Sequence, residues 1–409
     1  MELDTGNTAW VLISAALVMI MTPALGFFYS GLVRRENVLT TIMHSFTVLA
    51  IVSVQWVLWG YSLAFSGNVG GIIGNLDWFA FNGVSSNETY LAAGVPHSLW
   101  AVYQGMFAAI TTALITGAFA ERLKFKALIV FTLVWSTFVY SPICHWVWAP
   151  GGWLFDRGAL DFAGGTVVHI SSGIAAVVAA VLVGHRVSFG KSEAKPHNLT
   201  YTVLGASFLW FGWFGFNAGS AWAANGIAAN AFVVTNVAAA MGAISWVAAQ
   251  WLREGKPSVL AGAAGAVAGL VGITPAAGFV TPSSAIVIGF GAGLLCYFGL
   301  GFVKNILKVD DALDVFAVHG IGGIWGALAT GLFADSAVNA EYSGVFDGNT
   351  GQLWTQIIAI VSVGAFSGVA TLVILKAIDL TIGLRVTEPE ESVGLDESVH
   401  GEFGYNLAD

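Results

Sequence analysis

The sequence has 409 residues, of which 56% are hydrophobic and only 10% are charged, and its mean hydropathy is +0.78. Soluble domains carry about 25% charged residues, so this composition excludes a soluble protein and indicates one that crosses a membrane several times. The net charge is −9, but seven acidic residues lie after Arg385 with no Lys or Arg among them, and nothing favours nucleic-acid binding.

Stretches of roughly 20 apolar residues are long enough to span the hydrocarbon core as helices. Eleven such spans are predicted, over residues 8–32, 40–65, 98–120, 126–143, 162–184, 199–220, 228–251, 257–277, 283–302, 312–334 and 354–384. The first apolar stretch follows no basic segment and is too long for a signal peptide, so we expect it to be retained. Residues 1–385 would then form the membrane domain and 386–409 a separate tail.

Basic residues lie in alternate loops. If the N-terminus is outside, the inner loops and the tail hold every Lys and Arg except Arg157. Because short cytoplasmic loops are enriched in Lys and Arg, this pattern places the N-terminus outside and the C-terminus in the cytoplasm of a multi-pass cell-membrane protein. The two cysteines have no metal-ligand spacing, and we expect neither a metal nor a cofactor.

Two similar stretches lie 150 residues apart. Asp161–Gly173 reads DFAGGTVVHISSG and Asp311–Gly323 reads DALDVFAVHGIGG. Each places a histidine, His169 or His319, eight residues after an acid. Since 150 residues correspond to five spans, the halves would have opposite orientations. The predicted fold is therefore an all-α membrane protein with a five-plus-five inverted repeat and a long, tilted eleventh helix.

The two histidines are expected at similar depths. A helix rises 1.5 Å per residue, which puts each imidazole about 12 Å from opposite edges of a core about 30 Å thick. We therefore predict contact between His169 and His319 near the midplane. Ionisable residues within spans are costly and commonly functional, although either histidine could instead serve packing. Asp161 and Asp311 precede their spans, where a carboxylate caps a helix.

A second group of residues is aromatic and polar and lies near the outer helix ends. Its members are Tyr103, Gln104 and Phe107 early in the third span, Trp148 in the loop after the fourth span, and Phe216 and Ser220 at the end of the sixth. Ring faces beside Ser and Gln oxygens suit a small cation held by cation–π contact. An ordinary aromatic belt at the membrane interface would explain the same rings.

Several stretches together resemble an ammonium transporter of the Amt/Mep/Rh superfamily, on the Amt branch, over essentially the whole chain. They are Asp161–Gly173, Trp210–Ala221, Asp310–Gly323, Phe119–Leu123, Gly383–Val386 and His400–Glu402. The resemblance implies a homotrimer with one pore per subunit. It also implies a cytoplasmic tail that meets a PII-type signalling protein.

The resemblance also implies roles for individual residues. The outer ammonium site would include Phe107, Trp148 and Ser220, and Phe107 and Phe216 would form a phenylalanine gate. His169 and His319 match the twin histidines of the family, and Asp161 matches the acid needed for conduction. Tyr103 departs from the Phe that many relatives carry, and its added hydroxyl bears on affinity at the outer site.

The expected activity is conduction of ammonium in neutral form. NH4+ would lose a proton at the outer site, NH3 would pass the histidines, and the proton would cross separately and rejoin NH3 inside. K+ has no proton to lose and would be rejected. An ammonium sensor signalling through the tail and an NH3 or CO2 gas channel are the alternatives. The spans contain no nucleophile–base pair and no cofactor motif, so we do not expect an enzyme.

Overall fold

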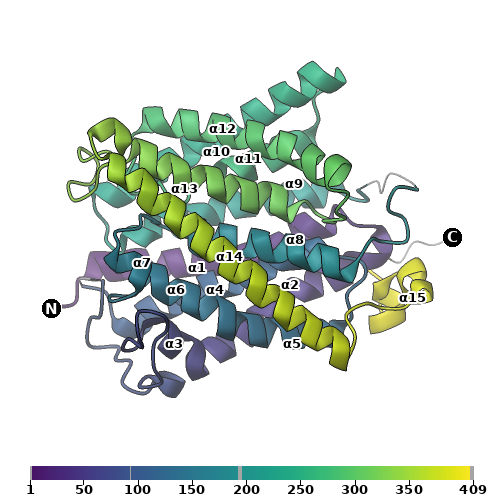
Figure 1. Ribbon diagram of the computed structural model, residues 1–409, viewed down its shortest axis with the longest axis horizontal. Coiled ribbons are helices and arrows are strands. Elements are labelled where there is room, and N and C mark those ends of the chain that lie inside the picture. Colours follow the sequence, from purple (N-terminus) through teal and green to yellow (C-terminus); the bar gives the residue numbers. More distant parts are fainter. Residues whose placement is uncertain (1, 93, 192–195, 406–409) are drawn as a thin grey trace.

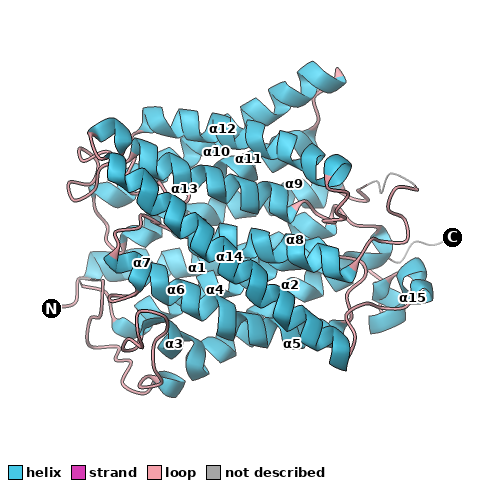
Figure 2. Cartoon of the chain, viewed as in Figure 1, coloured by secondary structure: helices cyan, strands magenta, loops and turns pink. Residues whose placement is uncertain are grey.

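The computed structural model describes residues 2–92, 94–191 and 196–405, so the predicted inner-loop residue Lys195 and tail residues 406–409 lie outside it. The described residues form helices joined by loops, with no β-strand among them (Figure 2). The α-helices are α1 (Thr5–Ser30), α2 (Val38–Gln55), α3 (Tyr61–Phe65), α4 (His97–Ile115), α5 (Phe125–Trp135), α6 (Ser141–Trp148), α7 (Trp153–Asp156), α8 (Ser171–Val183), α9 (Leu199–Trp213), α10 (Gly226–Glu254), α11 (Val259–Ile273), α12 (Pro282–Gly301), α13 (Gly322–Phe333), α14 (Thr350–Thr381) and α15 (Glu388–Val393).

Short π-helical and 3-10 turns join several of these helices into longer stretches. In the part of the chain that the structure describes, ten stretches are long and apolar enough to cross a membrane. They are Thr5–Ser30, Arg35–Phe65, His97–Phe119, Phe125–Asp156, Gly165–Val183, Leu199–Ala221, Gly226–Glu254, Pro282–Ile306, Phe316–Phe333 and Thr350–Thr381. The chain is therefore a multi-pass membrane protein.

The helix found within the predicted span 257–277 is shorter than the prediction. Its helix, α11, has only 15 residues, and at 1.5 Å per residue it is too short to cross a core of about 30 Å alone. Residues 274–279 continue it only as turns. The total of eleven crossings therefore stays a prediction.

The predicted end of the fourth span at residue 143 is wrong. Pro142 lies in the first turn of α6, where its missing N–H is tolerated, and the π-helical turn Ser136–Tyr140 leads directly into that helix. The helix consequently continues to Trp148. Trp148 is thus the last residue of α6 and does not lie in a loop.

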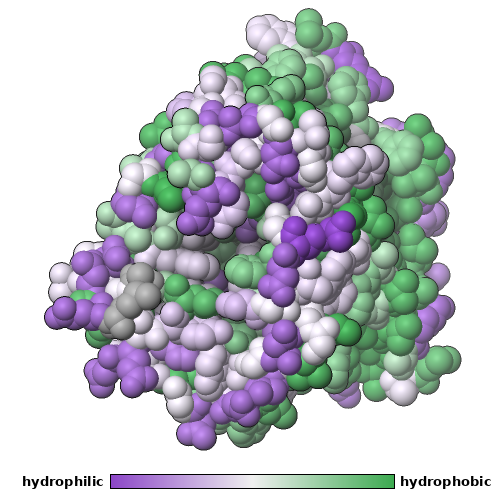
Figure 3. Space-filling view, turned by 60° about the vertical axis from the view of Figure 1, so that its left-hand side comes forward, coloured by the Kyte–Doolittle hydropathy of each residue, from purple (hydrophilic) through white to green (hydrophobic). Residues whose placement is uncertain are grey.

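The helices form a bundle in which the start of α1 and the short helix α15 lie at opposite ends (Figure 1). The 32-residue helix α14 runs obliquely across the outside of this bundle, in contact with α5, α8 and α13. Figure 3 turns the end with the N-terminus forward and shows hydrophilic residues gathered on it, with hydrophobic residues along the flank. This distribution is typical of a protein whose flank faces lipid.

Glycines bring α10, α11 and α12 close together. A Cβ on Gly265 or Gly269 would collide with the backbone of α10, and one on Gly289 would collide with Ala238 of the same helix. These positions belong to the small-residue faces that let membrane helices pack closely. Another face of α11, which carries Val267, lines the site described next.

Candidate functional site

The two predicted histidines meet at the centre of the bundle. His169 lies in the π-helical turn Gly165–Ile170 before α8, and His319 lies in the π-helical turn Phe316–Ile321 before α13. Their Nδ1 atoms are 3.2 Å apart and both side chains are buried. One Nδ1 must therefore donate the hydrogen and the other accept it. The expected contact between the rings is confirmed.

Asp161 fixes the turn that carries His169. Its carboxylate accepts hydrogen bonds of 2.5–3.1 Å from the backbone N–H groups of four successive residues, Gly164 to Val167. The Thr166 hydroxyl donates a further bond to it. These donors are the N–H groups that the first helical turn leaves unpaired. Asp161 thus caps the helix, as predicted.

Asp311 has fewer partners at the equivalent place. Its Oδ2 accepts a 2.7 Å bond from the Phe316 N–H, and its buried Oδ1 has no hydrogen-bond partner among the described residues. Burial and the neighbouring Asp314 carboxylate raise the pKa of Asp311 to about 7. Only part of the capping arrangement of Asp161 is therefore repeated here.

A cavity of about 500 Å³ opens at the end of the bundle that carries the N-terminus. Its lining includes Gln104, Phe107, Trp148, Asp161 and Ser220. The Phe107 and Trp148 rings meet edge to face with centroids 5.8 Å apart, and the Trp148 indole donates to the Asp161 carbonyl at 2.8 Å. The structure therefore brings five of the sequence-predicted residues to one cavity.

Tyr103 does not line this cavity. Its ring is fully buried behind Phe107, and its hydroxyl lies 3.1 Å from Ser220 Oγ and 3.0 Å from the Gly215 carbonyl oxygen. Tyr103 contacts the cavity through Ser220 rather than with its own ring face.

Two stacked phenylalanines close the cavity on its inner side. The Phe107 and Phe216 rings stack with centroids 4.2 Å apart. Phe216 and both histidines line a second cavity of about 10 Å³, which is about the space that one water molecule requires. Passage between the two cavities needs movement of at least one of these rings.

A third cavity, of about 340 Å³, begins at His319 and extends to the opposite end of the bundle. It shares Phe28, Val267 and His319 with the small cavity, and its lining includes Lys304 and Asp314. The three cavities therefore lie in a row, separated by the stacked phenylalanines and the histidine pair.

Two parts of this path were missed by the sequence analysis. Trp213 stacks on His169 with ring centroids 5.6 Å apart, and Lys304 forms an ion pair with Asp314. Trp213 lies one turn before Phe216 in the same aromatic stretch, and that spacing was the signal available. Nothing in the local sequence links Lys304 to Asp314, ten residues later.

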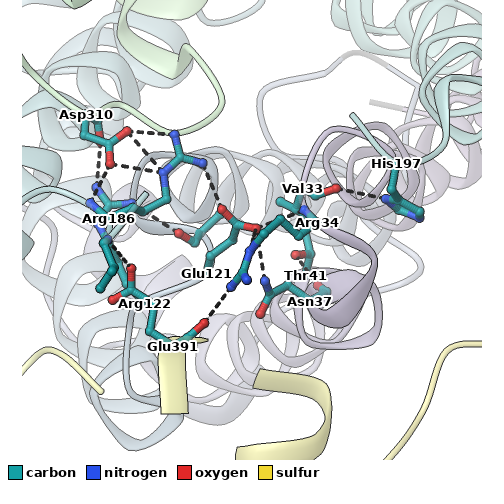
Figure 4. Close-up of polar contacts among 12 residues, drawn as sticks. Val33, Arg34, Asn37, Thr41, Glu121, Arg122, Arg186, His197, Asp310 and Glu391 are labelled. Carbon is teal, nitrogen blue, oxygen red and sulfur yellow. Dashed lines mark hydrogen bonds and ion pairs between the residues drawn. The ribbon is translucent and has the colours of Figure 1, made fainter. Parts of the chain in front are cut away.

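An ion-pair network joins loops at the end of the bundle opposite the start of α1 (Figure 4). Arg186 lies 2.8 Å from Asp310 and 2.9 Å from Glu121, and Glu121 also pairs with Arg34. Burial alone would raise the pKa of Asp310, but hydrogen bonds and charge from Arg186 outweigh it and hold that pKa below its ordinary value. The network fixes the residue next to Asp311.

The chain matches the model of the family described as "Ammonium Transporter Family" over residues 9–405. It is 49% identical over 405 residues to the ammonium transporter of Bacillus subtilis, covering 98% of this chain and 99% of that protein. It is 48% identical over 404 residues to ammonium transporter Amt1 of Archaeoglobus fulgidus, covering 98% and 100%.

Solved structures agree with this match. The crystal structure of Saccharomyces cerevisiae Mep2 superposes with a TM-score of 0.88 at 39% identity, over 95% of this chain and 88% of that one. A structure titled "Sensor Amt Protein" superposes with a TM-score of 0.89 at 30% identity, over 96% and 97%.

Proposed function

Because the chain belongs to the ammonium transporter family, we propose that it takes up NH4+ at the outer cavity and conducts it as NH3 past His169 and His319. The relatives are named as transporters and not as enzymes. The observation that carries the mechanism is the row of three cavities, interrupted by the stacked phenylalanines and the histidine pair.

The outer cavity suits a small cation. The rings of Phe107 and Trp148 attract positive charge by cation–π contact, and the Gln104 Oε1 atom is buried with no partner among the described residues. Ser220 adds a hydroxyl oxygen at the same cavity. These groups replace part of the water shell of NH4+, and the Asp161 carboxylate at the same cavity is already bound by five donors.

The narrow cavity favours an uncharged cargo. Removing the hydration of an ion is far more costly than removing that of a neutral molecule. NH4+ therefore gives up a proton before the Phe107–Phe216 pair, and NH3 enters a space the size of one water. The proton crosses separately along the imidazoles or through water and recombines with NH3 in the inner cavity, so one NH4+ leaves for each that enters.

Asp161 supports this path from the wall of the outer cavity. Its carboxylate is filled by five donors, so it holds the His169 turn in place and contributes negative charge near the outer cavity. In the second half, Asp311 occupies the related position. We propose the same five-plus-five inverted repeat and eleven crossings, with the N-terminus outside.

The assembly and partner complete the proposal. We propose a homotrimer in the cell membrane with one pore per subunit, and a cytoplasmic tail, residues 386–409, that meets a PII-type protein. The tail already contacts the loops, since the Arg34 guanidinium donates a 2.6 Å bond to the Glu391 carbonyl oxygen. The absence of a metal or cofactor from this mechanism follows from its chemistry, which needs only proton transfer.

A second candidate is ammonium sensing through the tail. It is favoured by the similarity to a structure titled "Sensor Amt Protein" and by the tail contacts with the loops. Ammonium-evoked current in proteoliposomes separates the candidates. Current supports transport of net charge, whereas binding without current supports sensing, and uptake without current supports a gas channel.

A further inference from the structure

The two histidine-bearing turns begin alike but are built differently. In the first, the carbonyl oxygen of Gly164 accepts from the Val168 N–H at 2.9 Å, and in the second the carbonyl oxygen of Asp314 accepts from the Val318 N–H at 3.1 Å. Gly164 and Asp314, whose carbonyls accept these bonds, both have a left-handed backbone conformation. Their φ angles are 117° and 61°. Each lies three residues after the acid and five before the histidine.

The second turn lacks two features of the first. A left-handed conformation is free of steric cost for glycine and unfavourable for residues with a Cβ. Thr166, whose hydroxyl donates to the Asp161 carboxylate, is replaced at the corresponding position by Phe316, which has no side-chain donor. Asp311 Oδ1 is correspondingly left without a partner among the described residues.

Lys304 is placed to compensate. It lies in the π-helical turn Phe302–Ile306 that ends α12, and its Nζ is 2.7 Å from Asp314 Oδ1 and 2.9 Å from Oδ2. The pair is only partly exposed, at 33% for Lys304 and 21% for Asp314. A buried or half-buried pair that holds one conformation stabilises that conformation even where its net contribution to folding is small.

We propose that Lys304 is a positioning residue for His319, because its ion pair with Asp314 holds the left-handed turn from which the His319 helix starts. The glycine and the threonine hydroxyl do this work in the first turn. This inference rests on the proposed function insofar as His319 lines the pore. It assigns Lys304 no contact with ammonium.

A double-variant experiment tests the inference. Lys304→Gln removes the charge and is expected to lower ammonium flux in proteoliposomes about fivefold. Asp314→Gly gives the second turn the glycine of the first, and its flux alone is the reference for the second background. Because glycine needs no ion pair to remain left-handed, Lys304→Gln in the Asp314→Gly background should stay within about twofold of Asp314→Gly alone.

Hydrogen exchange provides a readout that does not depend on transport. In detergent, Lys304→Gln should speed exchange of the backbone amides of 315–319, and the double variant should restore their protection. If wild type showed no flux but these amides behaved as expected, the proposed function would fail and the positioning role would stand.

The opposite result is equally clear. If flux fell equally in Lys304→Gln and in the double variant while the exchange of 315–319 stayed unchanged, Lys304 would act by its charge in the cavity, and the positioning role would be overturned. If Lys304→Gln did not fold, a double variant that purifies at wild-type yield would be the expected rescue. Failure of both to fold would also overturn the inference.

Discussion

His169 and His319 are the only titratable side chains among the described residues that line the narrow cavity. Their neighbours there are apolar, including Leu114, Val168 and Phe216. A charged cargo would meet no carboxylate in this cavity. NH3, in contrast, can accept a hydrogen bond from an imidazole or donate one to it. On the proposed mechanism, the pair therefore determines what can pass.

His169→Ala removes one of the two imidazoles and widens the cavity. We expect ammonium flux to fall about tenfold, equivalent to ~1.4 kcal/mol on the barrier, or K+ to begin to pass because water enters the enlarged space. Flux and K+ selectivity are measured in the same proteoliposomes. His185→Ala, at an exposed histidine outside the cavities, is the matched control. Wild-type rate and selectivity in His169→Ala would refute the role of the imidazole.

Tyr103→Phe removes the hydroxyl that lies beside Ser220. The Ser220 hydroxyl already donates to the Phe216 carbonyl oxygen at 2.8 Å, so losing Tyr103 as a partner frees its lone pairs for the cation. Ammonium affinity should rise by up to about fivefold, which corresponds to one hydrogen bond of ~1 kcal/mol. The ammonium concentration at half-maximal current measures it, and a fall in affinity would contradict this account of Ser220.

At the scale of single residues, spacing carried most of the information. An acid eight residues before a histidine, repeated once, was sufficient to expect that His169 and His319 meet. Tyr103 shows the limit, because the sequence cannot tell whether a ring lines a cavity or lies behind it. Lys304 and Asp314 come together only because the end of α12 packs against the turn before α13.

Among the helices, hydropathy located the apolar stretches but not their ends. Long apolar runs must form helices in lipid because their backbone groups have no other partners. The fourth span extends beyond residue 143 because a π-helical turn accommodates Pro142, and α11 is short because glycine-rich packing against α10 and α12 buries it in protein. Such local turns leave little trace in hydropathy.

The buried acids in the loops at the helix ends make opposite contributions to the pH dependence of the protein's stability. The lowered pKa values of Asp310 and Glu121, where Arg186 outweighs burial, mean that their stabilisation is present above about pH 4.5 and is lost as pH falls further. The pKa of Asp311, raised to about 7 by burial, means the reverse: its contribution is complete below about pH 4 and is lost as pH rises through 7.

We therefore expect the melting temperature of the purified protein to be highest near pH 4.5. Between about pH 5 and 7 it should fall by up to roughly 2 °C per pH unit, and above pH 7 this fall should end. Asp311→Asn mimics the protonated acid, and it should flatten the profile between pH 5 and 7 while leaving the acid limb unchanged. A wild-type melting temperature that rises steadily from pH 5 to 7 would contradict the assignment to Asp311.

For the whole molecule, the tail joins the rest of the chain through polar contacts, several of which are buried. The Asp396 carboxylate accepts from the backbone N–H groups of Leu39 and Thr40 at 2.9 and 2.7 Å, which caps the start of α2. The Glu391 carboxylate accepts from the Val187 N–H at 2.6 Å. A protein that binds the tail can therefore compete for contacts at the start of α2 and in the loop after α8.

Ending the chain after Arg385 removes these contacts and the proposed partner surface. We expect capture of a PII-type protein to be lost. Because the α2 cap is lost too, we also expect a decrease in stability of about 1 kcal/mol. A pull-down with purified PII protein measures the first effect, and Arg157→Gln, on the opposite face, is the control. Undiminished capture by the truncated chain would reject the tail as the docking site.

The central claim is that nitrogen crosses the histidine pair without its charge. The most direct measurement compares currents evoked by equal gradients of NH4+ and K+ across proteoliposomes that contain the purified protein. The account predicts a saturable current with NH4+ and none with K+, since K+ cannot shed a proton to enter a cavity the size of one water. K+ current of similar size would contradict it.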